Sequence, residues 1–200
     1  MIETGWVDLS EGLGSSTTNA LSHEQDMRWA AVIRLVPGEE VSTNPTERND
    51  LYVLKGSVSE SGHATYGPHT FLTRGVASLV AGETGAMLFV YREPSAAHAA
   101  QETAREHEME WRQGAVQGMR VASLLESYHT LMLVDWRAGT HMPYHDHPLG
   151  EEIFVLSGEL KDQRGKYPAG TWQRLHPGTG HSPYTDQPTL ILLRNGHLDA

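Results

Sequence analysis

The sequence predicts an all-β protein made of two copies of one domain. Short runs of β-branched and aromatic residues alternate with Gly, Pro, Asn and Asp turns, a pattern typical of a β-sandwich or barrel. Three runs of the first half are echoed roughly one hundred residues later: 32–38 by 133–139, 51–56 by 153–158, and 67–72 by 167–172. Internal repetition with this period indicates a duplicated domain.

The repeats also suggest where the domains lie. We expect residues 1–93 to form the N-terminal domain and residues 111–200 to form the C-terminal domain. The Ala- and Glu-rich segment 94–110 is interpreted as a linker that holds a short helix capped by Ser95.

Composition narrows the class of protein. The 200 residues are 38% hydrophobic and 20% charged, as in an ordinary soluble globular chain. No apolar run approaches the ~20 residues of a membrane helix, and the first residues lack signal-peptide features, so we expect a cytoplasmic protein with no membrane partner. The net charge of −10 opposes phosphate binding, so nucleic acid is not an expected partner. The absence of cysteine excludes disulfides, thiolate zinc ligands and a cysteine nucleophile.

Candidate metal ligands are concentrated in residues 139–158, G-T-H-M-P-Y-H-D-H-P-L-G-E-E-I-F-V-L-S-G. His145 and His147 are two residues apart, so on an extended strand both side chains leave the same face. A Pro-Leu-Gly turn follows, and Glu151 then begins a second apolar run. Two strands joined by a tight turn can aim three ligands at one point, and His181 lies downstream as a fourth.

This ligand set predicts one divalent metal ion in the C-terminal domain, bound by His145, His147, Glu151 and His181. Imidazole nitrogen and carboxylate oxygen suit zinc, iron, manganese, nickel and copper, so ligand type does not choose the metal. A structural zinc site has a closed shell of four ligands, whereas a catalytic metal keeps an open position. Four protein ligands fit either case, and no catalytic residue is assigned.

The same residues carry a family resemblance. The pattern G-x5-H-x-H-x3-E-x6-G is met by Gly139, His145, His147, Glu151 and Gly158, and it resembles the first motif of the cupin superfamily. The segment P-G-T-G-H at 177–181 is similar to the second cupin motif. The resemblance implies a double-stranded β-helix, or jelly roll, in each half, and therefore a bicupin.

The two halves resemble the superfamily unequally. Residues 111–198 are similar to the cupin domain of ChrR-type anti-sigma factors, whereas residues 1–93 resemble a cupin weakly. Two alignments of the repeats place other residue types opposite the two motif histidines: Thr43 and Pro45, or Asn44 and Thr46. Asn49 falls opposite Glu151, and Leu79 or Val80 falls opposite His181. We therefore expect the N-terminal domain to be a degenerate cupin without metal.

Three functions follow from the resemblance. The first is a sensory or regulatory protein, because the cupin domain of ChrR-type factors is implied to bind zinc and to respond to oxidative stress. Such factors bind the sigma factor through a separate zinc domain with a His and Cys signature. This chain has neither that signature nor room for the domain, which puts sigma-factor binding in doubt.

The second function is a non-haem metal-dependent dioxygenase acting on a small carbonyl-type substrate, since cupins include such enzymes. The third is a module that binds a small anionic or carbonyl ligand at an organising metal. Whether the protein is an enzyme stays open at this point, because function must be argued from the site and not from the fold. A homodimer is expected, because dimerisation covers exposed sheet edges.

Neighbouring residues receive weaker assignments. Glu152 alternates with Glu151, so it is predicted to face away from the metal, toward solvent or a backbone donor. Arg174 is expected in a surface salt bridge, and His176 in a hydrogen bond and not in coordination. His141 is interpreted as an exposed or outer residue, and Trp136 as core filling.

Overall fold

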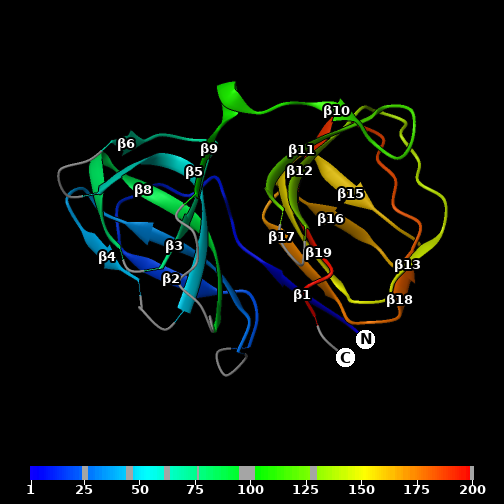
Figure 1. The fold of residues 1–200 in the computed structure, drawn as a ribbon, viewed down its shortest axis with the longest axis horizontal. Coiled ribbons are helices and arrows are strands. Elements are labelled where there is room, and N and C mark those ends of the chain that lie inside the picture. The colour runs from blue at the N-terminus through cyan, green and yellow to red at the C-terminus, as the bar shows by residue number, and fades with distance from the viewer. Residues whose placement is uncertain are drawn as a thin grey trace. The chain divides into compact units, whose positions relative to one another are not determined.

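The protein folds almost entirely as β-strands. The structure is a computed structural model that describes residues 1–23, 27–43, 47–60, 64–75, 77–94, 102–126 and 130–198. In these ranges the regular elements are strands β1 to β19 and one 3-10 turn, which confirms the predicted all-β class (Figure 1). Within the same ranges no helix is long and apolar enough to cross a membrane.

The chain divides into two compact units, and the division differs from the predicted one at the N-terminus. One unit is Ser10–Glu108, and the other combines Met1–Leu9 with Met109–Ala200. The first residues join the C-terminal unit because β1 (Ile2–Trp6) pairs antiparallel with β17 (Thr171–Leu175). Composition cannot reveal a pairing between strands that are far apart in the sequence, so a domain boundary based on composition missed it.

The described part of the predicted linker also forms regular structure. β9 (Glu102–Arg105) pairs with β7 (Thr70–Arg74), and the 3-10 turn Glu106–Glu108 follows. The predicted helix cap at Ser95 lies outside the described residues.

The C-terminal unit is an antiparallel jelly roll. Its large sheet has the order β1-β17-β14-β19-β12-β11-β10, and two small sheets, β13-β18 and β15-β16, complete the unit (Figure 1). The other strands of the large sheet are β10 (Arg112–Gln113), β11 (Met119–Glu126), β12 (Thr130–Trp136), β14 (Glu151–Ser157) and β19 (Thr189–Asn195). The small sheets are built from β13 (His145–His147), β18 (Thr179–His181), β15 (Glu159–Lys161) and β16 (Lys166–Pro168).

The N-terminal unit repeats this plan. Its sheet has the order β2-β3-β8-β5-β7-β9, with β4 paired to β8 and β6 paired to β5. The strands not yet bounded are β2 (Thr17–Ala20), β3 (Trp29–Leu35), β4 (Glu40–Ser42), β5 (Glu47–Glu60), β6 (Thr65–Tyr66) and β8 (Ser78–Pro94). The central run β3-β8-β5-β7 matches β12-β19-β14-β17 of the other unit, so the repeat seen in the sequence is also a repeat of topology.

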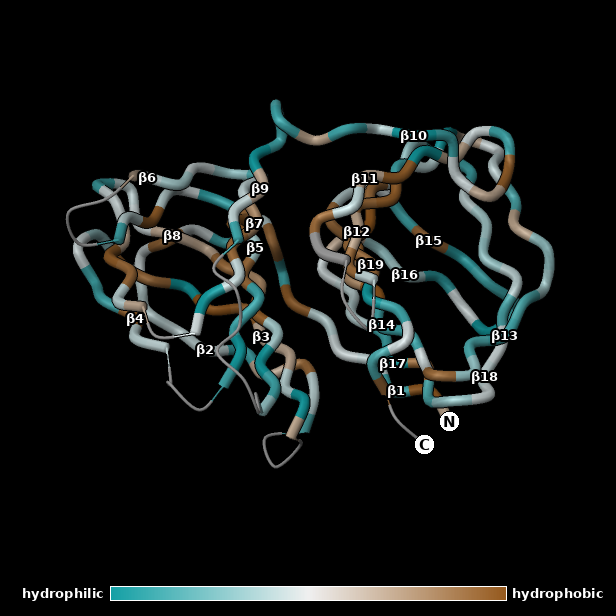
Figure 2. The backbone as a smooth tube through the Cα atoms, viewed as in Figure 1, coloured by the Kyte–Doolittle hydropathy of each residue, from teal (hydrophilic) through white to brown (hydrophobic). Residues whose placement is uncertain are grey.

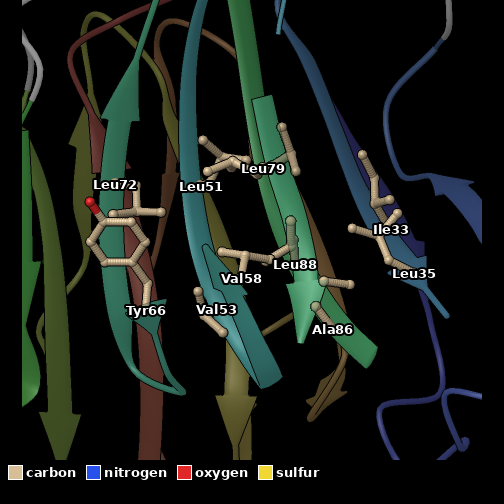
Figure 3. Packing of buried hydrophobic residues seen from close by; sticks show 12 residues of the cluster. Ile33, Leu35, Leu51, Val53, Val58, Tyr66, Leu72, Leu79, Ala86 and Leu88 are labelled. Atoms are coloured by element: carbon tan, nitrogen blue, oxygen red, sulfur yellow. The ribbon is translucent and has the colours of Figure 1, made fainter. Parts of the chain in front are cut away.

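The interior of the N-terminal unit is filled by apolar side chains. Leu51, Val53, Leu72 and Leu88 are buried in one cluster with residues from β3 and β8 (Figure 3). Brown, hydrophobic segments of the tube run along these inner strands (Figure 2). The buried residues form continuous runs in β3, in β7 and in the middle of β5 and β8, as expected for strands that are covered on both faces.

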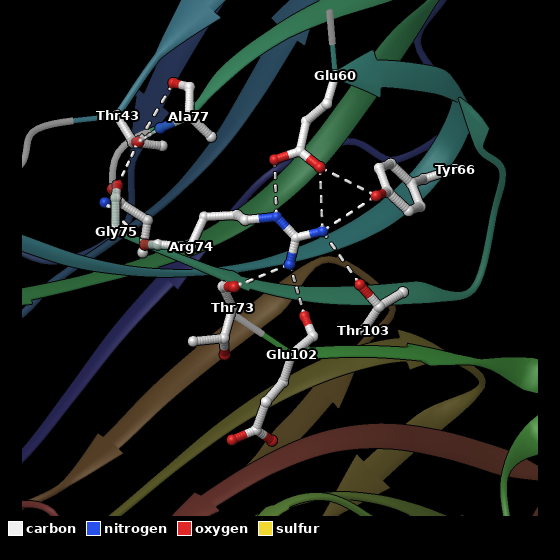
Figure 4. Close-up of polar contacts among 10 residues, drawn as sticks. Thr43, Glu60, Tyr66, Thr73, Arg74, Gly75, Ala77, Glu102 and Thr103 are labelled. Atoms are coloured by element: carbon white, nitrogen blue, oxygen red, sulfur yellow. Dashed lines mark hydrogen bonds and ion pairs between the residues drawn. The ribbon is translucent and has the colours of Figure 1, made fainter. Parts of the chain in front are cut away.

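A buried arginine of β7 is bonded to residues of three other strands of the same unit, β5, β6 and β9. The Arg74 guanidinium donates to the Glu60 carboxylate at 2.9 Å, to the Tyr66 hydroxyl at 3.1 Å and to the Glu102 backbone oxygen at 2.7 Å (Figure 4). A buried cation is tolerated when it is paired and its donors are bonded. Arg74 is therefore a structural residue, already neutralised by Glu60.

Equivalent turns of the two units share left-handed backbone. His69 and Gly170 have φ of 60° and 87°, and each backbone N–H donates at 2.8 Å to the oxygen of an equivalent valine, Val53 or Val155. The position in the C-terminal unit also needs glycine for space, because a Cβ built on Gly170 would lie 2.0 Å from the Val7 backbone oxygen. This close approach is where the chain leaves β1.

Replacing Gly170 with alanine is expected to lower the free energy of unfolding more than the matched change Gly139→Ala. Both residues have positive φ, which costs an L-residue roughly 1–2 kcal/mol, but nothing lies within 4 Å of a Cβ on Gly139. Only Gly170→Ala adds a clash with the β1 segment, so its cost should exceed that of Gly139→Ala by about 1 kcal/mol or more. Chemical denaturation of both variants measures the difference. Equal costs would contradict the docking of β1 on β17.

Candidate metal centre

Three imidazoles meet where two short strands pair. His145 and His147 lie on β13, and His181 lies directly opposite His145 on β18. One nitrogen of each ring falls within 4.8 Å of a nitrogen of the other two, and this is the metal-ligand group found in the described part of the chain. Two residues of one strand and one of its antiparallel partner share a face, which explains the convergence.

Glu151 completes the cluster from the large sheet. Its Oε1 lies 3.3 Å from His147 Nε2 and 3.5 Å from His181 Nε2, and those two nitrogens are 3.2 Å apart. Two donors bound at about 2.0–2.1 Å to a common ion are separated by about 2.9–3.4 Å. The spacing of these three atoms therefore fits a shared metal ion.

The ring of His145 is oriented by a hydrogen bond at Nδ1, which leaves Nε2 to act as the ligand atom. Its Nδ1 lies 2.9 Å from the Pro143 backbone oxygen, and a carbonyl oxygen can only accept, so Nδ1 carries the hydrogen. The lone pair is then on Nε2, the usual arrangement for a metal-binding histidine whose second nitrogen donates to a carbonyl.

Burial favours the uncharged form of three of the candidate ligands. Burial raises the pKa of the Glu151 carboxyl to about 8. Burial also lowers the pKa of His147 to about 4 and that of His181 to about 3, with the neighbouring imidazoles adding to the effect. Glu151 Oε1 is a buried acceptor with no hydrogen-bond partner among the described residues. Such an orphaned oxygen is costly, and a bound cation would satisfy it.

A turn that the sequence analysis did not single out supports His181. In the hairpin between β15 and β16, Asp162 Oδ1 accepts from the backbone N–H groups of Arg164 at 2.7 Å and Gly165 at 3.1 Å. Arg164 Nη2 donates at 2.7 Å to the backbone oxygen of Gly180, next to His181. The Asp162 carboxylate also lies 3.9 Å from His181 Nδ1. The Asp and Gly of the segment K-D-Q-R-G could have predicted this turn from the sequence, since both residue types favour such turns.

The four candidate ligands lie in the wall of a cavity of about 590 Å³. Apolar residues make up most of the rest of its lining: Gly114, Ala115, Met119, Val121, Met132, Val134, Trp136, Met142, Ile153, Leu160, Pro183, Ile191 and Leu193. Gln113, Asp146 and Asn195 are the other polar lining residues. Trp136 therefore lines the cavity as well as filling the interior. A volume in this range suits a small organic molecule.

The N-terminal unit has a different set of residues at the equivalent places. Glu40 pairs with Val80 and Ser42 with Ser78 on strands β4 and β8, in the arrangement that pairs His145 with His181. In β4 the pairing gives a register different from both sequence alignments, because one residue lies between Gly38 and Glu40 whereas five lie between Gly139 and His145. Asn49 does match Glu151 in its place on the central strand.

Two of the weaker assignments are confirmed. His141 is exposed and its ring stacks on Tyr184, with centroids 4.9 Å apart, and it is outside the three-histidine group. His176 Nε2 forms a hydrogen-bond contact with a carboxylate oxygen of Glu3 on β1.

The assignments of Glu152 and Arg174 are wrong. Glu152 does face away from Glu151, but it is 0% exposed, and it accepts from Arg174 Nε at 2.7 Å and from His197 Nε2 at 2.8 Å. Although burial opposes it, the His197 hydrogen bond and the charges of Arg174 and Arg194 hold the pKa of Glu152 below its usual range. Both faces of the central strand β14 are covered, so Glu152 is buried although it lies on the face opposite Glu151.

This jelly roll with a converging histidine cluster belongs to the class of cupin-fold proteins, as solved structures show. A protein from Pseudomonas aeruginosa that is described as glyoxylate-induced is similar, with a TM-score of 0.74 at 14% identity, over 90% of this chain and 79% of that one. A protein described as a dioxygenase from Nostoc punctiforme has a TM-score of 0.74 at 13% identity, over 99% and 80%. Bacillus subtilis oxalate decarboxylase, whose Mn(II) centres have been studied, has 0.67 at 14%, over 95% and 77%.

The chain belongs to the ChrR cupin-like domain family, whose model matches residues 100–199. No curated protein matches the chain in sequence. At these low identities the solved structures show a shared fold, and they do not carry an activity to this chain.

Proposed function

We propose that the C-terminal unit binds one divalent metal ion through His145, His147, Glu151 and His181, and uses it to bind a small molecule. The observation that carries the proposal is the buried, unpartnered Glu151 Oε1, 3.3 Å and 3.5 Å from two imidazole nitrogens. Three neutral nitrogens and one carboxylate form a donor set for zinc, iron or manganese.

The residues of the proposed site have different roles. His145, His147, His181 and Glu151 hold it at the wall of the cavity, and the hydrogen bond from His145 Nδ1 to the Pro143 oxygen orients one ring. The apolar lining excludes water from the ligand side. When bound, a divalent ion would supply Lewis-acid attraction for an oxygen of the ligand. This arrangement serves a sensory or ligand-binding protein of the ChrR-like kind, without requiring chemistry.

A second candidate is a non-haem dioxygenase for a small carbonyl-type substrate. It is favoured by the cavity, which borders the ligand cluster and gives room for a substrate beside the ion. The two functions differ in the metal that they need, because oxygen chemistry requires a redox metal and simple ligand binding does not.

Elemental analysis tests the proposal. We expect about one metal ion per chain in protein purified without added metal and without a metal-affinity column. Oxygen uptake by the iron-loaded protein, offered small carbonyl compounds, then separates the candidates: uptake favours the dioxygenase, and its absence favours ligand binding. Protein that neither retains nor takes up metal would overturn the proposed function.

A further inference from the structure

We propose that the cavity selects a small organic monoanion with one metal-chelating head and an apolar body, and that it excludes compact dianions. The inference rests on the proposed function, because the head is bound at the proposed metal. It adds the class of ligand, which the metal alone does not determine.

The charge of the centre limits the charge of the ligand. A histidine binds a metal ion as neutral imidazole and a glutamate binds it as carboxylate, so a divalent ion held by His145, His147, His181 and Glu151 has a net charge of +1. One anionic head neutralises this charge. A dianion would leave a net negative charge within a largely apolar cavity, and a buried charge without a partner is costly.

The walls offer no second cation. No lysine or arginine is among the described residues that line the cavity. Arg164 lies outside the lining, and its guanidinium donates to the Asp162 carboxylate at 3.3 Å and to the Gly180 backbone oxygen at 2.7 Å. A second carboxylate, or a phosphate, would therefore find no guanidinium or ammonium partner in the lining.

The remaining lining fits an apolar body. Met132 and Val134 from β12 and Ile191 and Leu193 from β19 lie on paired strands, since Met132 is opposite Leu193 and Val134 is opposite Ile191. Each methylene that leaves water on such a surface gains about 0.8 kcal/mol, or roughly fourfold in affinity. A ligand with a chain of several carbons gains most from this wall.

Alkyl hydroxamates of increasing length test the inference, since each is a chelator that binds as a monoanion. With zinc-loaded protein, we expect hexanohydroxamate to bind at least about tenfold more tightly than acetohydroxamate, and oxalate to bind more weakly than either. Calorimetry measures the affinities, and metal analysis after gel filtration verifies that zinc stays on the protein. Equal affinity of the two hydroxamates, or tighter binding of oxalate, would overturn the inference while leaving metal binding intact.

A pair of variants locates the apolar wall. Met132 is half-buried, so the polar side chains of Met132→Lys and Met132→Gln can be accommodated. Met132→Lys should lower the affinity for hexanohydroxamate by about tenfold and raise the affinity for oxalate. Met132→Gln, which matches methionine in size and is neutral, should leave the affinity for oxalate unchanged. The affinity for acetohydroxamate should change by less than about threefold in both variants. Oxalate binding unaltered by the lysine would contradict the charge argument, and failure of the wild-type protein to bind zinc would instead overturn the proposed function.

Discussion

Replacing His145 and His147 together with alanine is expected to reduce the metal content from about one ion per chain to near zero. Both rings belong to the mutually close group, and their loss leaves His181 and Glu151 as the remaining candidate ligands. Two protein donors rarely hold a divalent ion against water, since stable sites use three or four. Elemental analysis after gel filtration measures the change.

His141→Ala is the matched control for this loss. It also removes an imidazole, four residues before His145, but that ring is exposed and stacks on Tyr184 outside the cluster. Its metal content should equal that of the wild type. Full retention of metal by the double variant would show that the ion is bound elsewhere, and circular dichroism of both proteins distinguishes metal loss from unfolding.

Glu152→Gln is expected to lower the free energy of unfolding by about 3–5 kcal/mol, the usual cost of removing one partner from a buried ion pair. Glu152 is fully buried and bonded to the Arg174 guanidinium at 2.7 Å and to His197 at 2.8 Å. The neutral amide keeps the size of the side chain but removes the buried carboxylate of the pair, and the other carboxylate near Arg174, Glu3, is 3.8 Å away and one-third exposed. Denaturant unfolding measures the cost.

Asp135→Asn provides the comparison on the same sheet. It removes the carboxylate that pairs with Arg120, whose side chain is 50% exposed, so the expected cost is below about 1 kcal/mol. The apparent stability must be compared in metal-free protein, because a bound ion would add its own stabilisation. Similar small costs for the two variants would mean that Glu152 and Arg174 do not form a buried pair in solution.

The ligand cluster shows how far a sequence pattern reaches. The spacing of His145 and His147 predicts a common face because strand periodicity is local, and the structure brings His181 to the same place. Glu151 was predicted because a tight turn joins its strand to that of the two histidines, and its carboxylate contacts His147 and His181. The binding of metal by these four residues stays a prediction.

Other features could not be predicted because they depend on contacts distant in sequence. Residues 1–9 join the C-terminal unit through a pairing of β1 with β17, some 170 residues away. The register of β4 in the N-terminal unit depends on a loop shorter than its counterpart, which a gapless alignment misplaces.

The sequence by itself determined the all-β class, the duplicated pattern and the candidate ligands, because strand periodicity, turn residues and motif spacing are properties of neighbouring residues. Only the tertiary structure decided the environment of each group. Glu151 and Glu152 are adjacent and identical in chemistry, yet burial without a partner raises the pKa of one, while His197 and two arginines hold down that of the other. Solvation and partners are set by packing across strands, and the order of residues along the chain does not contain them.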